Sequence, residues 1–257
     1  MTIHGFKWNM RARSAALLLS LESRLDRIMQ GWLLVVGLAC AVRIAASPAN
    51  GPVGVESLLP YSLVILAPFA SMVLALRWFA DARNIPQPTT RLAIVGRWRS
   101  VVPEEAQRHP LFGTTGIMVS LLIGMLLNVP VRTAEYLAVM PALSGSVPTW
   151  LSTLHMLMTI DVVMLSSLYT IAFVAALRRV PLFPRLLVAV WMIDILMQVT
   201  IASFMGAGGG LPPGVAAGLH GLLDGNVTKV LISVGLWLPY LLLSVRVNVT
   251  YRSRVPD

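Results

Sequence analysis

The chain has 257 residues, of which 56% are hydrophobic and only 12% are charged. An average soluble domain has about 25% charged residues, so this composition argues against a water-soluble globular fold. The formal charge is +9, and the single cysteine, Cys40, excludes an intramolecular disulfide framework and a cysteine-built metal site. The composition therefore indicates an integral membrane protein.

Six segments are apolar and long enough, or nearly so, to cross a hydrocarbon core about 30 Å thick, which takes about 20 helical residues. In chain order they are residues 31–46, 57–79, 112–129, 150–177, 186–205 and 227–247. The second segment contains Pro60 and Pro68, which a membrane helix tolerates where its neighbours satisfy the freed carbonyl groups. The sequence thus predicts an all-α fold, a polytopic membrane bundle of six transmembrane helices over residues 31–247.

The two ends of the chain are predicted to lie outside the membrane domain. Residues 1–30 form an N-terminal tail, and within it residues 14–30 are apolar on one side and charged on the other. This pattern favours an interfacial amphipathic helix that leads into the first span. Residues 248–257 are predicted to form a second, C-terminal tail.

Three segments in two connections have a composition that suggests local structure. Residues 91–102 combine a tryptophan with several arginines and favour a second interfacial element, and residues 103–110 (PEEAQRHP) favour a solvated turn. Residues 206–225 contain many glycines and two prolines, which disfavour a regular helix as far as Gly214. For residues 206–225 we therefore expect a flexible or re-entrant loop, in which residues 215–223 could enter the interface as a short helix.

The basic residues orient the bundle. Seventeen of the twenty fall in the two tails and in the second and fourth connections, which leaves Arg43, Arg132 and Lys229 for the opposite side. Because short cytoplasmic loops accumulate Lys and Arg, we expect a multi-pass protein of the bacterial inner membrane with both termini in the cytoplasm. Membrane topology and attraction to anionic lipids at the cytoplasmic face explain the net positive charge of the chain, so no nucleic-acid partner is predicted.

Ionisable groups inside a membrane span cost about 2.5–3.5 kcal/mol each and suggest function by default. Arg43, Asp161 and Asp194 qualify. By helix rise, Asp161 and Asp194 lie about 24 Å and about 12 Å from the inner ends of their spans, so we expect different depths and no carboxylate pair. Arg43 is expected to reach Asp161, either as a bundle-fixing ion pair or in a transport path. Gln198 is expected to hydrogen-bond Asp194. Asp194 is then either a neutral group that holds helices together by hydrogen bonds or a candidate for proton relay.

A polar cluster of Asn128, Arg132 and Glu135 follows the third predicted span at its outer edge. Arg132 and Glu135 are three residues apart, so a local ion pair between them is predicted. The four histidines do not combine with acidic residues at metal-ligand spacing, and a Gly-x-Ser-x-Gly motif does not occur. The sequence therefore predicts no metal, no cofactor and no catalytic residue.

Two stretches carry a resemblance to a known family. Residues 178–185 read RRVPLFPR and lead into the fifth span, and residues 236–254 read LWLPYLLLSVRVNVTYRSR. Together they resemble the bacterial membrane family DUF2569. The matching residues are Phe183, Pro184, Trp237, Tyr240, Ser244, Arg246, Val247 and Thr250. The chain departs from the family pattern in its two-span N-terminal portion and at Asn248, where a basic residue is usual. The family has no established activity, so the resemblance implies a fold and no reaction.

Three classes of function remain open. The first expectation is a non-catalytic accessory or scaffold subunit that packs against a membrane-protein partner, because few polar groups are recognised inside the spans. The alternative is a small proton-linked transporter or channel, expected as a homo-oligomer, that uses Asp161 and Asp194. The third is an intramembrane enzyme acting on a lipid or a peptide, for which the sequence offers no matched nucleophile and base.

Overall fold

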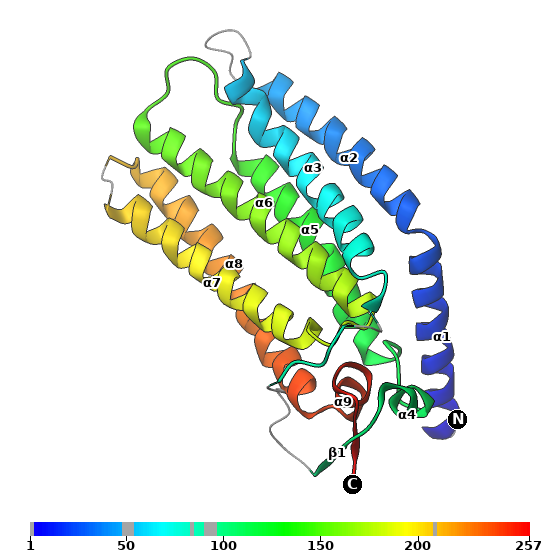
Figure 1. The fold of residues 1–257 in the computed structure, drawn as a ribbon. Helices are drawn as coiled ribbons and strands as arrows, with labels where there is room; N and C mark the ends of the chain where they lie inside the picture. The colour runs from blue at the N-terminus through cyan, green and yellow to red at the C-terminus, as the bar shows by residue number, and fades with distance from the viewer. Residues whose placement is uncertain (1–2, 48–53, 83–84, 90–96, 208–209) are drawn as a thin grey trace.

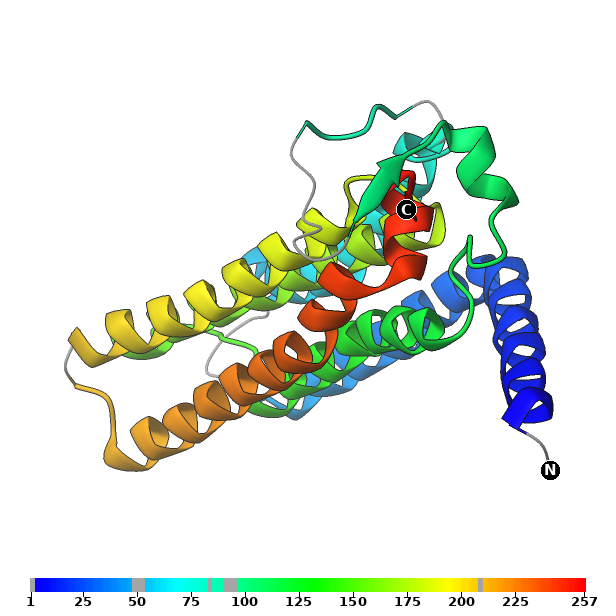
Figure 2. The same cartoon turned by 90° about the horizontal axis from the view of Figure 1, so that it is seen from below.

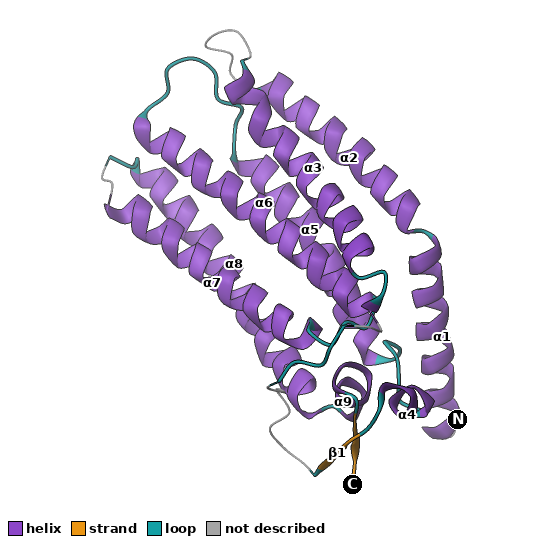
Figure 3. Ribbon diagram, viewed as in Figure 1, coloured by secondary structure: helices purple, strands orange, loops and turns teal. Residues whose placement is uncertain are grey.

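The computed structural model describes residues 3–47, 54–82, 85–89, 97–207 and 210–257. Within them the chain forms nine helices and one pair of strands (Figure 1), and Figure 3 shows how little of the fold is sheet. The helices are α1 (Ile3–Ser23), α2 (Leu25–Ala46), α3 (Val55–Trp78), α4 (Pro103–Arg108), α5 (Ile117–Val139), α6 (Thr149–Leu177), α7 (Phe183–Ala207), α8 (Pro213–Leu243) and α9 (Val245–Arg252). The strands β1 (Trp98–Ser100) and β2 (Arg254–Pro256) pair antiparallel.

Six of the described helices, α2, α3, α5, α6, α7 and α8, are long and apolar enough to cross a membrane. The prediction of an all-α membrane bundle with six spans is confirmed by the length and composition of these helices. Helix α6 packs against α3, α5 and α7, while α2 packs on α3 and α8 on α7 (Figure 1). In α6, 67% of the most apolar stretch is buried, against 11% in α2 and 17% in α8. Helix α6 is therefore the centre of the bundle, and α2 and α8 lie at its edges.

Two spans differ from their predicted extents. The third was predicted over residues 112–129, whereas α5 begins at Ile117, continues through Pro130 and ends at Val139. A proline inside a membrane helix is tolerated because neighbouring helices and side chains satisfy the freed backbone groups. The sixth was predicted over residues 227–247, whereas α8 runs from Pro213 to Leu243. The glycine-rich residues 213–225 are thus helical, since Pro213 fits the first turn of a helix, where its missing N–H is not needed.

The N-terminal helix also differs from its prediction. Residues 14–30 do not form one interfacial helix, because α1 ends at Ser23 and α2 begins at Leu25. The break is at Arg24, whose φ of −112° and ψ of 6° are not helical. Because of this break, α1, which precedes it, runs at a steep angle to the spans (Figure 2). Residues 25–30, which were assigned to the tail, therefore belong to the first span.

Residues 248–257, predicted as a C-terminal tail, are folded and mostly buried. Helix α9 and β2 fold back on the bundle end that also holds the N-terminus and α4, which we call the terminal end (Figure 2). Tyr251, 1% exposed, donates its hydroxyl hydrogen bond to the carbonyl oxygen of Ala176 at 2.9 Å. Burial, together with Arg254 and Arg185 nearby, lowers the pKa of Arg252 to about 10, so Arg252 stays cationic at neutral pH.

The connection before α5 is correspondingly more ordered than expected. Residues 103–108 form α4 rather than a solvated turn, and residues 98–100 form β1, paired with β2. Of the interfacial element predicted over residues 91–102, residues 91–96 lie outside the described part of the chain. The terminal end is thus closed by segments far apart in the sequence, which no local pattern brings together.

Candidate functional site

The centre of the bundle contains an arginine that joins three helices. Arg132 on α5 is 7% exposed and contacts a carboxylate on each of α6 and α7. Its Nη1 donates to Oδ2 of Asp161 at 2.7 Å, and its Nη2 donates to Oδ1 and Oδ2 of Asp194 at 2.7 and 2.8 Å. Both aspartates are almost fully buried, with 3% and 0% exposed. Charged hydrogen bonds of this length are the strong class, and the planar guanidinium suits two carboxylates at once.

Two further side chains complete the hydrogen bonding of the carboxylates. The hydroxyl of Tyr169 donates to Asp194 Oδ2 at 2.9 Å. The amide of Gln198 donates to Asp161 Oδ1 at 2.9 Å and, as the sequence suggested, also contacts Asp194, at 3.5 Å. All four carboxylate oxygens therefore accept a hydrogen bond from a protein donor. With both acids ionised, one positive and two negative charges leave this centre a net charge of −1.

This geometry corrects three expectations. Asp161 and Asp194 were expected at different depths and apart, but both contact the guanidinium of Arg132 and the same amide nitrogen of Gln198, so their carboxyl groups lie close together. Arg43 does not reach Asp161, since its Nε donates to the carbonyl oxygen of Met140 at 2.9 Å. Arg132 does not pair with Glu135: α5 continues past Val129, so Arg132 faces the interior while Glu135 forms an ion pair with Lys229 of α8.

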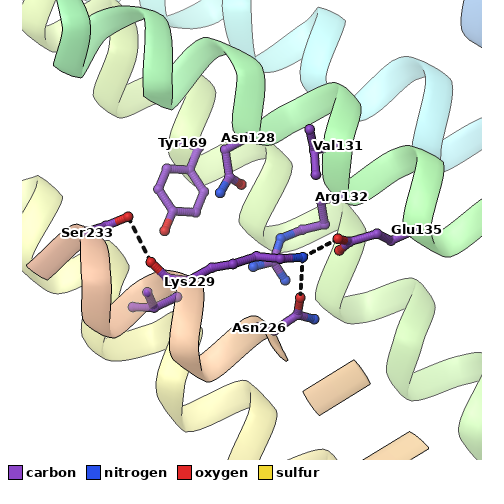
Figure 4. A pocket seen from close by; sticks show the side chains of 9 residues that line it. Asn128, Val131, Arg132, Glu135, Tyr169, Asn226, Lys229 and Ser233 are labelled. Carbon is purple, nitrogen blue, oxygen red and sulfur yellow. Dashed lines mark hydrogen bonds and ion pairs between the residues drawn. The ribbon is translucent and has the colours of Figure 1, made fainter. Parts of the chain in front are cut away.

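A second layer of polar side chains extends the network to α8 (Figure 4). Asn226 donates through Nδ2 to Gln198 Oε1 at 3.3 Å, and Lys229 Nζ donates to Asn226 Oδ1 at 3.3 Å. The side chain of Lys229 is 57% exposed, so the contacts run from the surface of α8 to the buried carboxylates. Sequence reasoning missed Asn226, because the sixth span was predicted to begin one residue later. Its spacing of three residues from Lys229 on one helix face was the available indication.

A small pocket of about 40 Å³ lies beside the network, between α5 and α8 (Figure 4). Asn128, the first residue of the predicted outer-edge cluster, and Arg132 both line it. Arg132 Nε and Asn128 Oδ1 are buried and have no hydrogen-bond partner among the described residues. A site for one water needs about 10–15 Å³ and at least two polar partners. The pocket has room for a water molecule, and two of its lining residues carry unpartnered polar atoms.

Buried polar side chains lie on both sides of this centre. Away from the terminal end, the Tyr136 hydroxyl lies 2.9 Å from Thr159 Oγ1 and 3.5 Å from His155 Nε2, all three buried. Toward the terminal end, Ser166 and Thr170 of α6 are buried among large apolar side chains that include Leu122, Leu165, Phe173 and Leu187. Polar groups are thus interrupted by bulky apolar side chains on the side of the terminal end.

The residues of the DUF2569-like pattern lie apart from the network. Phe183 packs on Tyr251 with ring centroids 4.9 Å apart, and Trp237 lies edge-on to Tyr240 at 6.0 Å. Thr250 Oγ1 accepts a hydrogen bond from the Gly113 N–H at 3.0 Å. The other members lie in the same region: Pro184 and Val247 are buried, Ser244 links α8 to α9, and Arg246 donates to Thr115 at 2.8 Å. These residues position the terminal end rather than the polar centre.

Comparison with family models, with curated proteins and with solved structures gives no match to this chain. The resemblance to DUF2569 accordingly stays a prediction from the residues that carry it. Among the described residues, no group of three His, Cys, Asp or Glu side chains could hold a metal ion. The network around Arg132 is therefore the feature of the molecule that points to a function.

Proposed function

We propose that this protein is a small proton-linked transporter or channel, and that Asp161, Arg132 and Asp194 form its proton-binding centre. The observation that carries the proposal is a buried arginine in contact with two buried carboxyl groups between three membrane-spanning helices, a centre whose net charge is −1 when both acids are ionised. Ionisable groups at such depth are costly in a membrane, and they typically mark ion pathways and proton relays. A proton or another cation is the species that balances the excess negative charge.

The hydrogen bonding gives proton uptake a mechanical consequence. Each carboxylate oxygen faces a donor in the structure, whereas a protonated carboxyl group must itself donate a hydrogen bond. Protonation of Asp161 would therefore break or reverse a contact with Arg132 or Gln198. Because these contacts tie α5 and α7 to α6, proton binding would loosen the packing of three helices. This coupling is what alternating access requires.

A polar cluster offers a route to the network from one end of the bundle. The Tyr136, Thr159 and His155 cluster lies between the network and the end away from the termini. Water and protons would approach the carboxylates from that end. Access from the terminal end would need large buried side chains there, such as Phe173 and Leu187, to part, which loosening of the Arg132 contacts would allow.

The proposal extends to orientation. Helices α1, α4 and α9 lie at the terminal end (Figure 1), and the two tails and the second and fourth connections contain seventeen of the twenty basic residues. The excess of basic residues supports placing this end in the cytoplasm, in a bacterial inner membrane.

Cysteine labelling tests this orientation. Cys40 is 2% exposed and is the only cysteine in the chain, so the parent protein should stay unlabelled by a membrane-impermeant maleimide in intact bacteria. We expect Ser146→Cys, between α5 and α6, to be labelled in intact cells. Gln107→Cys, on α4, should be labelled only after the membrane is opened. The reverse pattern would contradict a cytoplasmic terminal end.

Proton movement through the protein tests the function itself. The purified chain is reconstituted into liposomes that contain a pH-sensitive dye, and a pH gradient is imposed with a potassium ionophore present to dissipate the membrane potential. We expect internal acidification to be faster than in liposomes without protein. Equal rates with and without protein would contradict the proposal.

An accessory subunit is the second candidate function. Its sequence argument was the scarcity of polar groups inside the spans, and the network around Arg132 weakens that argument. The observation that still favours it is the large exposed apolar area of the edge helices, since only 11% of α2 and 17% of α8 is buried. Such sides suit a membrane-protein partner or a second copy of the chain, which native mass spectrometry would reveal as a stoichiometric additional chain.

A further inference from the structure

An apolar groove of about 360 Å³ lies between α2, α3 and α5. This volume lies within the range of about 300–1,000 Å³ typical of ligand sites. Trp32, Phe69 and Met72 line it, and Thr170 of α6 contributes a hydroxyl-bearing side chain. The groove lies in the half of the bundle nearer the terminal end, because its lining begins at Ile28, in the first turn of α2.

The groove exists because α2 packs closely along α3 and only weakly against α5. Gly31 of α2 lines it and leaves space, since a Cβ atom added there would meet no other atom within 4 Å. Pro68 of α3 and Pro130 of α5 also line it. Prolines interrupt the regular packing of a helix, which keeps the walls apart. The hollow is therefore a property of the sequence and not of one side-chain rotamer.

Two arginines, with Asp26 between them, precede the groove lining on α2. Arg24 and Arg27 are exposed at the start of α2 and lie one helical turn before Ile28 and Gly31, two residues of the lining. An apolar cavity with cations at the membrane surface matches an amphiphile with an anionic head. We propose that the groove binds one acyl chain of an anionic phospholipid, with its phosphate held by Arg24 and Arg27. This inference is independent of proton transport and requires only that the bundle lie in a bilayer.

The test uses the full-length protein in mild detergent, with phosphatidylglycerol or phosphatidylcholine added and the bound lipid counted by native mass spectrometry. The parent should bind one phosphatidylglycerol in preference to phosphatidylcholine. Gly31→Leu fills the groove and should abolish this binding. Gly37→Leu is the matched control, because Gly37 lies on the same helix with equal space around it but outside the groove lining. Leucine is the better helix former, so both variants should fold.

The arginines are tested separately. Each of Arg24→Gln and Arg27→Gln should weaken phosphatidylglycerol binding about fivefold, equivalent to about 1 kcal/mol for a basic residue near an anionic surface. Binding of phosphatidylcholine should not change. Equal phosphatidylglycerol binding by Gly31→Leu and Gly37→Leu would overturn the proposal, as would equal affinity of the parent for the two lipids. A dimer that Gly31→Leu dissociates would also overturn it, because a second copy of the chain would then fill the groove.

Discussion

Replacing Arg132 with methionine is expected to destabilise the protein by about 3–5 kcal/mol, the cost of removing one partner from a buried ion pair. Methionine has a similar length and no charge, so the substitution leaves Asp161 and Asp194 buried without a cation. It also removes the guanidinium that joins α5 to α6 and α7. Thermal unfolding in detergent, followed by the fraction of monodisperse protein, measures the loss.

Two comparisons show whether the ion pairs cause this loss. Arg43→Met removes a half-buried arginine of another span whose Nε donates to a backbone carbonyl, and it should cost much less. In the triple variant Arg132→Met, Asp161→Asn, Asp194→Asn, no buried charge is left unpaired, so much of the stability should return. Equal losses in Arg132→Met and Arg43→Met, or no recovery in the triple variant, would contradict this electrostatic role.

Asp194→Asn is expected to lower the proton flux into liposomes by about a hundredfold or more, the contribution typical of a positioned proton-transfer group. Asparagine has the shape of aspartate and can still accept the hydrogen bond of Tyr169, but it cannot take up a proton. Asp161→Asn should act in the same direction. Flux is compared at equal amounts of reconstituted protein, with unfolding checked separately for each variant.

The matched control is Asp224→Asn. Asp224 lies on α8, two residues before Asn226, but its side chain is exposed and it makes none of the contacts described around Arg132. Flux in Asp224→Asn should equal that of the parent. If Asp194→Asn conducts protons as fast as Asp224→Asn, the buried carboxylates are structural and the proposed function is wrong.

The membrane fold was largely predictable because a span of about 20 apolar residues is a local property of the sequence. Asp161, Asp194 and Gln198 stood out for the same reason, as polar residues inside apolar runs. Arg132, the common partner of the two aspartates, did not, because the apolar run of the third span ends at Val129, just before Pro130, and Arg132 was therefore placed outside the membrane. Only the contacts with α6 and α7 reveal that α5 continues.

Contacts between distant segments were not predictable. The short strand β1 pairs with β2 more than 150 residues later, and neither has the length or alternation that marks a strand. Helix α9 is polar by composition, so it resembled a solvated tail, although Val247, Val249 and Tyr251 are at most 1% exposed. Likewise, no local pattern encodes which helices are neighbours. The sequence therefore could not show that one arginine would form ion pairs with two aspartates.

Proton uptake by the Asp161, Arg132 and Asp194 network is tested most directly by infrared spectroscopy of the purified protein as the pH is lowered. A protonated carboxyl group absorbs separately from an ionised carboxylate. We predict that the parent gains the band of a buried protonated carboxyl group over the pH range in which it conducts protons. The band should disappear in Asp161→Asn or Asp194→Asn and remain in Asp224→Asn. No such band in the parent, or a band that survives in both network variants, would contradict a proton-binding centre at Arg132.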